Sequence, residues 1–160
     1  MKKILFVCTG NTCRSPMAEA IFRDLIAKSN KNEEFTVSSA GLHAFSGTGA
    51  SQMSIDVCGL HGLDINNHIS SQFVSEMLFD FNWVITMTNS QKSAICGEYI
   101  IPEEVEVSSV YEFSDNENDH SRDIEDPFGG DMEDYLRTFD ELYKCIKSVV
   151  DKINKNGDIK

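Results

Sequence analysis

The sequence predicts an α/β protein in which a parallel β-sheet is covered by helices on both faces. Short apolar runs alternate along the chain with segments whose apolar residues recur at helical spacing, and this alternation is typical of strand–helix–strand units. The apolar runs are also continuous, which indicates strands that are buried on both faces. With 160 residues, the chain is long enough for a full core, and we expect one domain over residues 1–160.

The first half of the chain predicts two strand–helix pairs. The run Lys3–Cys8 indicates a buried strand, and a polar loop separates it from a helix that begins near Ser15 and Pro16, a capping side chain followed by a proline. The segment Phe35–Gly41 predicts a second strand, and residues 50–61 predict a second helix. Because ligands of parallel sheets bind beyond the carboxyl ends of the strands, the loop after the first strand is well placed for chemistry.

The second half of the chain predicts two further strands among helices. The expected elements are a short helix around Val74–Phe79, a strand over Asn82–Met87, a helix from Asn89 or Ser90, a strand over Val105–Phe113 and a long C-terminal helix from Met132 to Ile153. The last helix carries an apolar stripe with steps of three residues and one residue, as expected of a helix that faces the core. Between Glu112 and Asp134, ten acidic residues and one basic residue follow no period, which indicates a loop with a solvated acidic surface.

The composition restricts the partners of the protein. The chain has 26 acidic and 14 basic residues and a net charge of −12, so a phosphate polymer or an anionic membrane would be repelled over most of the surface. We therefore expect neither nucleic acid nor a membrane as a partner. The apolar stretch Ile4–Cys8 is shorter than the roughly 7 to 15 residues of a signal peptide core, and we expect a cytoplasmic protein.

The five cysteines have no paired spacing that would indicate a disulfide framework. Cys58, Cys96 and Cys145 lie in helix-like apolar contexts and are interpreted as ordinary buried thiols. Cys8 and Cys13 differ, because they flank a polar loop. Chemistry is therefore expected at these two cysteines.

The loop from Cys8 to Ser15 has the spacing C-x5-R-S, which suits phosphoryl transfer. Backbone N–H groups at the N-terminus of a helix form a concave anion site, and Gly10 is expected to permit the tight turn. Arg14 offers a planar fork for two phosphate oxygens. A thiol at Cys8 faces these N–H dipoles and the guanidinium, so we expect an activated nucleophile to which Ser15 donates a hydrogen bond.

Two other interpretations of this loop remain open from the residues alone. Cys8 and Cys13 could be zinc ligands, since their spacing is within the usual range, but no compact histidine pair exists and Arg14 would lie next to the cation. The histidines available for such a site are His43, His61, His68 and His120. A loop that only binds phosphate would explain the glycine and the arginine but would leave Cys8 without a purpose.

Cysteine-dependent phosphoryl transfer also needs an acid that protonates the leaving group. The acidic loop offers Asp115, Asp119, Asp123, Glu125 and Asp126, and the pattern alone does not choose among them. Asp126 differs from the others because Pro127 fixes the backbone beside it and Phe128 could form the wall of a pocket. A simple Asp-Pro turn is the alternative interpretation.

Two segments resemble the low-molecular-weight protein tyrosine phosphatases: VCTGNTCRSPMAEAIF, residues 7–22, and DPFGG, residues 126–130. The resemblance continues through SSAGL (Ser38–Leu42) and NHISSQ (Asn67–Gln72) to the C-terminal helix. It implies a three-layer fold with a four-stranded parallel sheet of strand order 2-1-3-4. It also implies a phosphatase that acts on a phosphorylated protein without metal or cofactor and binds inorganic phosphate or vanadate in its active site.

The resemblance implies roles for individual residues. Cys8 would form a phosphocysteine intermediate, Arg14 would bind the phosphoryl group, and Asp126 would act first as general acid and then as general base. The residues implied for the phosphate-binding loop are Thr9, Gly10, Asn11, Thr12, Cys13 and Ser15, those implied for its support are Ser39 and His68, and those implied for the substrate pocket are Phe45 and Phe128. For His68 a surface or capping role is the alternative. Cys13 resembles the family's second loop cysteine, which can form a disulfide with the nucleophile and protect it from oxidation.

One position departs from the common pattern of this family. Many tyrosine-directed members carry Ile or Leu at the position of Thr12, whereas a threonine resembles the bacterial protein-arginine phosphatases of the same family. A smaller polar side chain leaves room and a hydrogen-bonding group for a guanidinium, and an acidic rim would attract that cation. The sequence therefore favours phosphoarginine over phosphotyrosine. The related arsenate reductases require a further closely spaced cysteine pair, and Cys58, Cys96 and Cys145 are far apart in the sequence.

Overall fold

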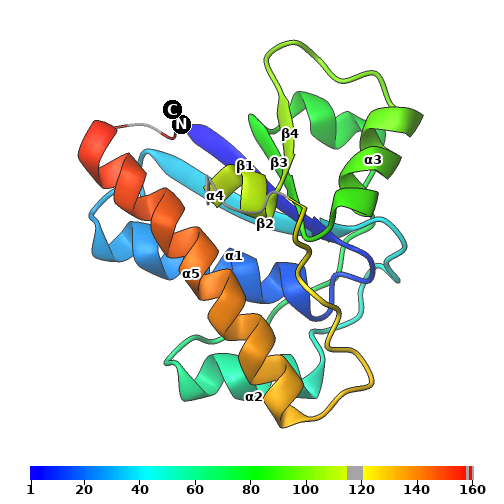
Figure 1. Cartoon of the computed structure of the whole chain (residues 1–160), viewed down its shortest axis with the longest axis vertical. Helices are drawn as coiled ribbons and strands as arrows, with labels where there is room; N and C mark the ends of the chain where they lie inside the picture. The colour runs from blue at the N-terminus through cyan, green and yellow to red at the C-terminus, as the bar shows by residue number, and fades with distance from the viewer. Residues whose placement is uncertain (115–120, 158, 160) are drawn as a thin grey trace.

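The protein folds into three layers, with a parallel sheet between two layers of helices (Figure 1). The structure is a computed structural model that describes residues 1–114, 121–157 and 159. Within these residues the sheet has the strand order β2-β1-β3-β4, as predicted. Its strands are β1 (Lys2–Cys8), β2 (Phe35–Gly41), β3 (Trp83–Thr86) and β4 (Glu106–Ser109).

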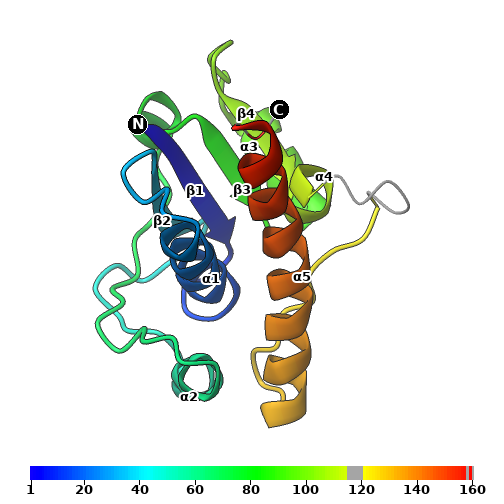
Figure 2. The ribbon, with the colours of Figure 1, turned by 90° about the vertical axis from the view of Figure 1, so that its left-hand side faces the viewer.

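The helices divide between the two faces of the sheet. They are α1 (Arg14–Lys28), α2 (Gln52–Leu60), the 3-10 helix η1 (Ser75–Phe79), α3 (Asn89–Glu98), α4 (Val110–Ser114) and α5 (Met132–Asn156). The larger core cluster joins one face of the sheet to α1, α2, α4 and α5, and the smaller cluster joins the other face to η1 and α3. Figure 2 shows α1 and α5 side by side in the first of these layers. None of the helices in the described ranges combines the length and the apolarity needed to cross a membrane.

Strand β1 lies at the centre of this arrangement. It pairs with β2 on one side and with β3 on the other, and every residue from Ile4 to Cys8 is buried. The side chains of Ile4 and Phe6 belong to the larger cluster, whereas Leu5 and Val7 belong to the smaller one. The alternation of side chains along a strand explains why a continuous apolar run is needed at this place.

The C-terminal helix α5 confirms the predicted amphipathic element. Asp131 begins it with a capping box, since its side chain accepts a hydrogen bond from the backbone N–H of Asp134 and the Asp134 side chain accepts one from the backbone N–H of Asp131. Gly157 ends it in the left-handed conformation with φ 75°. The apolar stripe of α5 is buried against α1 and α2. This packing completes the helix layer on that face of the sheet.

The predicted strand Val105–Phe113 is wrong in its second half. Strand β4 ends at Ser109, and Val110 begins the helix α4. A capping box turns the chain here: the backbone N–H of Glu112 donates to the Ser109 hydroxyl, and the backbone N–H of Ser109 donates to the Glu112 carboxylate. The run of β-branched and aromatic residues favours a strand, but the Ser-x-x-Glu capping pattern and the burial of Val110 and Phe113 decide for a helix.

Two smaller predictions are also corrected. Helix α1 begins at Arg14 after Cys13, with no side-chain cap, and the hydroxyl of Ser15 turns away from the helix terminus toward Cys8. Among the cysteines, Cys58 is buried as expected and burial raises the pKa of its thiol to about 12. Cys145 is also buried, whereas Cys96 is exposed on the outer side of α3.

Candidate active site

The loop between β1 and α1 closes around the sulfur of Cys8. Cys8 is 3% exposed, at the carboxyl end of the central strand. The backbone N–H of Asn11 donates to its Sγ over 3.2 Å, and the Ser15 hydroxyl lies 2.9 Å from the same sulfur. The sulfur is therefore held by two polar groups of the loop.

Asn11 holds the shape of this loop. Its backbone has φ 55°, a left-handed conformation that asparagine tolerates better than most residues. Its side-chain N–H₂ donates to the hydroxyls of Ser15 over 2.8 Å and Ser39 over 3.0 Å, and its side-chain oxygen accepts from the backbone N–H of Ser71 over 2.9 Å. The buried amide therefore uses both ends to tie the loop to β2 and to the segment after α2.

The backbone carbonyl of Asn11 is fixed by two further side chains. His68 Nε2 lies 2.8 Å from this carbonyl oxygen, and the Ser70 hydroxyl donates to it over 2.8 Å. Because a carbonyl oxygen can only accept a hydrogen bond, Nε2 of His68 is the donor and carries a proton. Ser70 and Ser71 were not predicted, although they stand within the segment NHISSQ that carries part of the family resemblance.

The glycine that the loop requires is Gly41, at the end of β2, rather than Gly10. Gly10 does not adopt a positive φ, and a Cβ there would lie 3.7 Å from the nearest side-chain atom, Thr12 Oγ1. A Cβ at Gly41 would lie 2.5 Å from the carbonyl oxygen of Thr9 and 2.9 Å from the backbone nitrogen of Asn11. The phosphate loop therefore packs directly on the backbone of β2, where only glycine fits.

The protons of this network can be assigned by counting donors and acceptors. Ser39 donates its single hydroxyl proton to the carboxylate of Glu19 over 2.6 Å, so its oxygen is an acceptor for Asn11. Asn11 in turn donates its second amide proton to the Ser15 oxygen. The Ser15 proton is then available for the sulfur of Cys8 at 2.9 Å, with the Ala40 carbonyl as a longer alternative at 3.4 Å.

Arg14 connects the loop to the Asp-Pro segment. Its side chain is 5% exposed, its Nη1 donates to the carbonyl of Ile124 over 3.0 Å, and its Nη2 lies 3.4 Å from Asp126 Oδ2. The Ile124 backbone N–H is in turn bound to the Met87 carbonyl after β3. The guanidinium of Arg14 therefore lies between the loop and the carboxylate of Asp126.

Among the acid candidates in the described residues, Asp126 alone lines the cavity above Cys8. Its side chain is 49% exposed, and its Oδ1 accepts a hydrogen bond from the backbone N–H of Phe128. Asp123 instead accepts from the backbone N–H of Asn89 at the start of α3 over 2.7 Å. Glu125 is exposed and lines a different depression, and Asp115 and Asp119 lie outside the described residues.

The cavity above Cys8 has a volume of about 310 Å³. Its floor is the loop with Cys8 and Arg14, and its walls come from two other segments of the chain. The lining residues are Cys8, Thr9, Gly10, Thr12, Cys13, Arg14, His43, Phe45, Thr48, Asp126 and Phe128. Phe45 and Phe128 stand at its mouth with 83% and 76% of their surface exposed, which is unusual for phenylalanine. His43 and Thr48 were not predicted, and no sequence pattern indicates them.

Cys13 points away from the floor of the cavity. Its sulfur lies 3.4 Å from the Ser51 hydroxyl and 3.4 Å from the Tyr135 hydroxyl of α5. Burial, together with the hydrogen bond to Cys13, raises the pKa of Tyr135 to about 12. Both loop cysteines are free thiols.

Gln91 is a further residue that the sequence did not reveal. It is buried in the first turn of α3, and its Nε2 donates to the Thr9 hydroxyl over 3.1 Å. Its Oε1 accepts from the backbone N–H groups of Met87 and Thr88. Gln91 therefore links Thr9, the first residue after β1, to the end of β3 through hydrogen bonds.

Among the candidate zinc-binding histidines that the structure describes, only His43 lines the same cavity as Cys8 and Cys13. His61 stacks on Phe139 with ring centroids 3.9 Å apart, His68 is engaged by Asn11, and His120 lies outside the described residues. No group of three or more potential metal ligands occurs in the part of the chain that the structure describes. The geometry around Cys8 instead forms a site for an anion.

Comparison with known proteins shows the family to which the chain belongs. Residues 3–158 match the family model described as low molecular weight phosphotyrosine protein phosphatase. The chain is 31% identical to the protein-arginine-phosphatase of Bacillus subtilis, over 96% of this chain and 97% of that protein. It is 34% identical to the low molecular weight protein-tyrosine-phosphatase PtpB of Staphylococcus haemolyticus, over 90% of this chain and 94% of that protein.

A solved structure extends the likeness to three dimensions. The YwlE arginine phosphatase from Geobacillus stearothermophilus superposes with a TM-score of 0.84 at 35% identity, covering 97% of this chain and 94% of that chain. Relatives with arginine and with tyrosine in their names are thus similar to this chain to nearly the same degree. With nearly its whole length matched, the chain belongs to the low molecular weight phosphotyrosine protein phosphatase family.

Proposed function

We propose that this protein phosphatase hydrolyses phosphorylated side chains through a phosphocysteine intermediate on Cys8. The observation that carries the proposal is the position of the Cys8 sulfur, which receives the N–H of Asn11 at the floor of a cavity that Arg14 and Asp126 also line. This arrangement supplies a nucleophile, a phosphate clamp and a proton donor around one small volume.

In the first step the sulfur of Cys8 attacks the phosphorus atom from the side opposite the leaving group. The loop N–H groups and the guanidinium of Arg14 hold the phosphoryl oxygens, where they stabilise the charge of the transition state. A P–S bond forms as the bond between phosphorus and the leaving nitrogen or oxygen breaks. Asp126 gives its proton to that leaving atom, which departs as a neutral group.

In the second step a water molecule hydrolyses the phosphocysteine. Asp126, now a carboxylate, accepts a proton from the water as its oxygen attacks the phosphorus. The P–S bond breaks, inorganic phosphate is released and the electron pair returns to the sulfur of Cys8. The Ser15 hydroxyl, at 2.9 Å from the sulfur, donates to the departing thiolate and makes it a better leaving group.

The remaining loop residues are proposed to support this chemistry. Thr9, Gly10, Asn11 and Cys13 shape the loop, with Ser39 and His68 bracing Asn11, and inorganic phosphate or vanadate would occupy the same site as a competitive ligand. Phe45 and Phe128 would hold the substrate side chain at the mouth of the cavity. We also propose that Cys13 protects Cys8 by forming a reversible disulfide on oxidation, and that the protein acts in the cytoplasm.

We favour phosphoarginine as the substrate because of Thr12. Thr12 lines the cavity, and its side chain is shorter and more polar than the Ile or Leu of many tyrosine-directed members. A guanidinium group needs space in its plane and hydrogen-bond acceptors at its nitrogen atoms. The hydroxyl oxygen of Thr12 and the carbonyl oxygen of the protonated Asp126 side chain provide acceptors on the lining of the same cavity.

Phosphotyrosine is the second candidate, because exposed Phe45 and Phe128 could flank an aromatic ring and a tyrosine phosphatase is among the similar proteins. Arsenate reduction is disfavoured, because the arsenate reductases require a further closely spaced cysteine pair and Cys58, Cys96 and Cys145 are far apart in the sequence. Neither alternative uses the hydroxyl of Thr12.

Steady-state rates on a phosphoarginine peptide and a phosphotyrosine peptide, for the wild type and three variants at Thr12, test the proposal. Thr12→Ile should lower the ratio of phosphoarginine to phosphotyrosine kcat/KM by about tenfold or more, the effect of one misplaced hydrogen-bonding group. Thr12→Val removes only the hydroxyl, and Thr12→Ser keeps it, so the pair separates size from hydrogen bonding. An unchanged ratio in Thr12→Ile would overturn the substrate assignment, while a phosphoryl group trapped on a residue other than Cys8 would overturn the mechanism itself.

A further inference from the structure

The outer edge of β2 carries backbone groups that face away from the sheet. Strand β2 lies at one edge of the sheet, and the backbone groups of Glu34 and Leu42 bond to β1. Because successive residues of a strand direct their backbone groups to alternate sides, the residues at even positions of β2 face β1. The N–H and C=O groups of Val37 and Ser39 therefore face outward.

The same edge is already used at its carboxyl end. The N–H of Gly41 donates to the carbonyl of Ser71, and the carbonyl of Gly41 accepts from the N–H of Phe73, which makes a parallel bridge. The chain then leaves the edge. At the other end the N–H of Phe35 donates to the carbonyl of Lys31. In the described part of the chain no residue pairs with the backbone groups of Val37 or Ser39, so the lane beside β2 is open between its two ends.

Two cavities lie along this open lane. The larger one has a volume of about 520 Å³ and reaches both faces of the sheet, since it is lined by Ser38 and Leu5 from one face and by Ser39 and Glu19 from the other. A second cavity of about 300 Å³ continues along Phe35, Thr36 and Val37. Arg23 lines both, so the two cavities adjoin along β2, and together they are called the groove.

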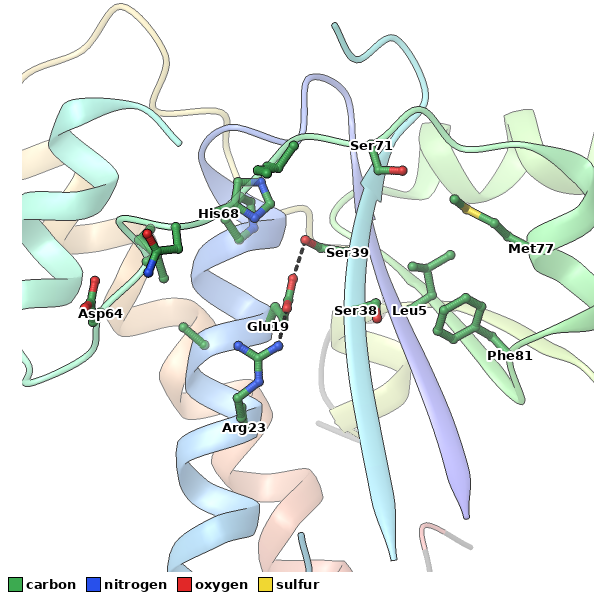
Figure 3. A pocket seen from close by; sticks show the side chains of 15 residues that line it. Leu5, Glu19, Arg23, Ser38, Ser39, Asp64, His68, Ser71, Met77 and Phe81 are labelled. Atoms are coloured by element: carbon green, nitrogen blue, oxygen red, sulfur yellow. Dashed lines mark hydrogen bonds and ion pairs between the residues drawn. The ribbon is translucent and has the colours of Figure 1, made fainter. Parts of the chain in front are cut away.

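Figure 3 looks onto this edge, with β2 in front of β1. On one side lie Leu5, Met77 and Phe81, which are apolar. On the other side Glu19 accepts from Ser39 and pairs with Arg23. One wall is therefore apolar, whereas the other, here called the polar wall, carries charged groups beside the apolar residues Pro16, Ala20, Ile65 and Ile69.

The polar wall is the more acidic one. It holds the carboxylates of Glu19 and Asp64 and the single guanidinium of Arg23, and Arg23 is already paired with Glu19. Hydrogen bonds from Asn66 lower the pKa of Asp64, which keeps it charged at neutral pH. The wall therefore retains negative charge, in a chain of net charge −12.

We propose that the open edge of β2 binds an extended segment of a partner protein as an additional strand, with apolar and basic side chains in alternation. A strand placed beside Val37 and Ser39 would pair with their outward backbone groups and direct its side chains alternately to the two faces of the sheet. Apolar side chains would enter the wall of Leu5, Met77 and Phe81, and basic ones would meet Glu19 and Asp64. A second copy of this chain would bind less well at this edge, because two chains that each carry a net charge of −12 repel one another.

This edge is linked to the candidate active site through one residue. The backbone of Ser39 faces the groove, whereas its hydroxyl accepts from Asn11 and donates to Glu19. A bound strand therefore changes the surroundings of the Asn11 side chain. The proposal does not depend on the phosphatase chemistry, and peptide binding is measured without turnover.

The test uses a short unphosphorylated peptide of alternating Lys and Val, no longer than the open part of β2 between Phe35 and Gly41, in three forms. One form is unmodified, one is N-methylated at every Lys and one at every Val. In an added strand the N–H groups of one alternating set face β2 and those of the other face solvent, so one methylated form should bind like the unmodified peptide. The other should bind about tenfold more weakly or worse, since each lost hydrogen bond contributes on the order of 1 kcal/mol.

Calorimetry at physiological salt supplies the affinities, and backbone NMR shifts locate the site. Shifts at residues 35–39 and at the Asn11 side-chain amide support the proposal. Equal affinity of the two methylated forms, shifts confined to the cavity above Cys8, or self-association of the protein through β2 would each overturn it.

Variants at Val37 add a check from the protein side. Val37→Pro removes an outward N–H that binds nothing within the described chain, and proline is tolerated on edge strands, so binding should fall about tenfold while the fold remains. Val37→Ala keeps the N–H and should bind as the wild type does. If Val37→Pro does not fold, the methylated peptides still decide the proposal.

Discussion

The phosphate loop and the Asp-Pro segment, residues 124–130, provide the two halves of the proposed chemistry, but they are built in different ways. In the loop, Asn11 is fully buried and is held through its backbone and both ends of its side chain. In the Asp-Pro segment, Asp126 has nearly half its side chain in solvent and is held by the N–H of Phe128 and by Arg14 at 3.4 Å. The proposed nucleophile Cys8 is therefore buried within the loop, whereas the proposed acid Asp126 is exposed to water.

This difference follows from what each half has to do. A site that stabilises developing negative charge works best when its dipoles are fixed before the substrate arrives, so the loop is packed on Gly41 and braced from several segments. An acid that protonates the leaving group and then accepts a proton from the attacking water has to be accessible to both the leaving group and that water. Substitutions in the loop should therefore damage stability and chemistry together, whereas substitutions at Asp126 should affect chemistry alone.

The largest effect is expected at Cys8. Cys8→Ser replaces the sulfur by a much poorer nucleophile and should lower kcat by about 10⁴-fold or more, in the range seen when a catalytic nucleophile is removed. The loop N–H groups and Arg14 stay in place, so the variant should still bind phosphate or vanadate, measured by calorimetry. Hydrolysis at the normal rate by this variant would remove Cys8 from the mechanism.

Asp126→Ala should give the next largest effect. The loss of a positioned general acid should lower kcat by roughly 10² to 10⁴-fold for substrates with poor leaving groups, and much less for an activated ester such as a nitrophenyl phosphate. Because the Asp126 side chain is exposed, thermal stability should not change. Rates across a series of leaving groups provide the measurement.

Asp123→Ala is the matched control for this prediction. Asp123 lies in the same acidic stretch but binds the backbone N–H of Asn89. This variant should keep its activity on all leaving groups and lose about 1 kcal/mol of stability, the usual contribution of a hydrogen bond at the start of a helix. Equal rate losses for good and poor leaving groups in Asp126→Ala would mean that another group is the acid.

The same contrast explains which features the sequence could predict. Strands β1 and β3 are marked by continuous apolar runs and α5 by its stripe. The alternation of strands and helices, and with it the position of the loop, could therefore be predicted from periodicity. Cys8, Arg14 and Ser15 lie close together in the sequence and have side chains suited to phosphoryl transfer. Their roles could therefore be proposed from their spacing. Local signals of this kind do not depend on the tertiary structure.

The supports of the loop could not be predicted in the same way, because they come from distant segments. Gln91 reaches Thr9 from α3 and Glu19 reaches Ser39 across the layer between α1 and β2, and neither contact leaves a periodic pattern. Gly10 was expected to provide the tight turn because it lies in the loop, whereas the close approach occurs at Gly41. Close packing between two backbones becomes visible only in three dimensions.

Gly41→Ala tests the rigidity of the loop side. A Cβ at this position would lie 2.5 Å from the carbonyl oxygen of Thr9, so the loop or β2 has to shift. We expect a loss of about 1 to 3 kcal/mol of stability, typical of overpacking, and a fall of roughly tenfold in kcat/KM as the donors move out of position. Thermal unfolding and steady-state rates on the same preparation measure both.

Gly10→Ala is the companion variant within the loop itself. Its Cβ would have an ordinary contact of 3.7 Å with Thr12 Oγ1 and no positive φ to oppose it, so both stability and rate should stay close to the wild type. If Gly10→Ala were the more damaging of the two, the rigidity of the loop would come from its own turn and not from packing on β2.

The smallest effect is expected at Phe128, on the open side of the comparison. Phe128 is 76% exposed and lines the mouth of the cavity, so its ring contacts the substrate without holding the fold. Phe128→Ala should raise KM by roughly three- to tenfold, since an aromatic or cation–π contact contributes about 0.5 to 1.5 kcal/mol, and should leave kcat and thermal stability unchanged. Phe128→Tyr keeps the ring and should keep the wild-type KM. A fall in kcat without a change in KM would instead show that the ring acts through Asp126, whose carboxylate accepts the Phe128 N–H, and the open side would then be as tightly organised as the loop.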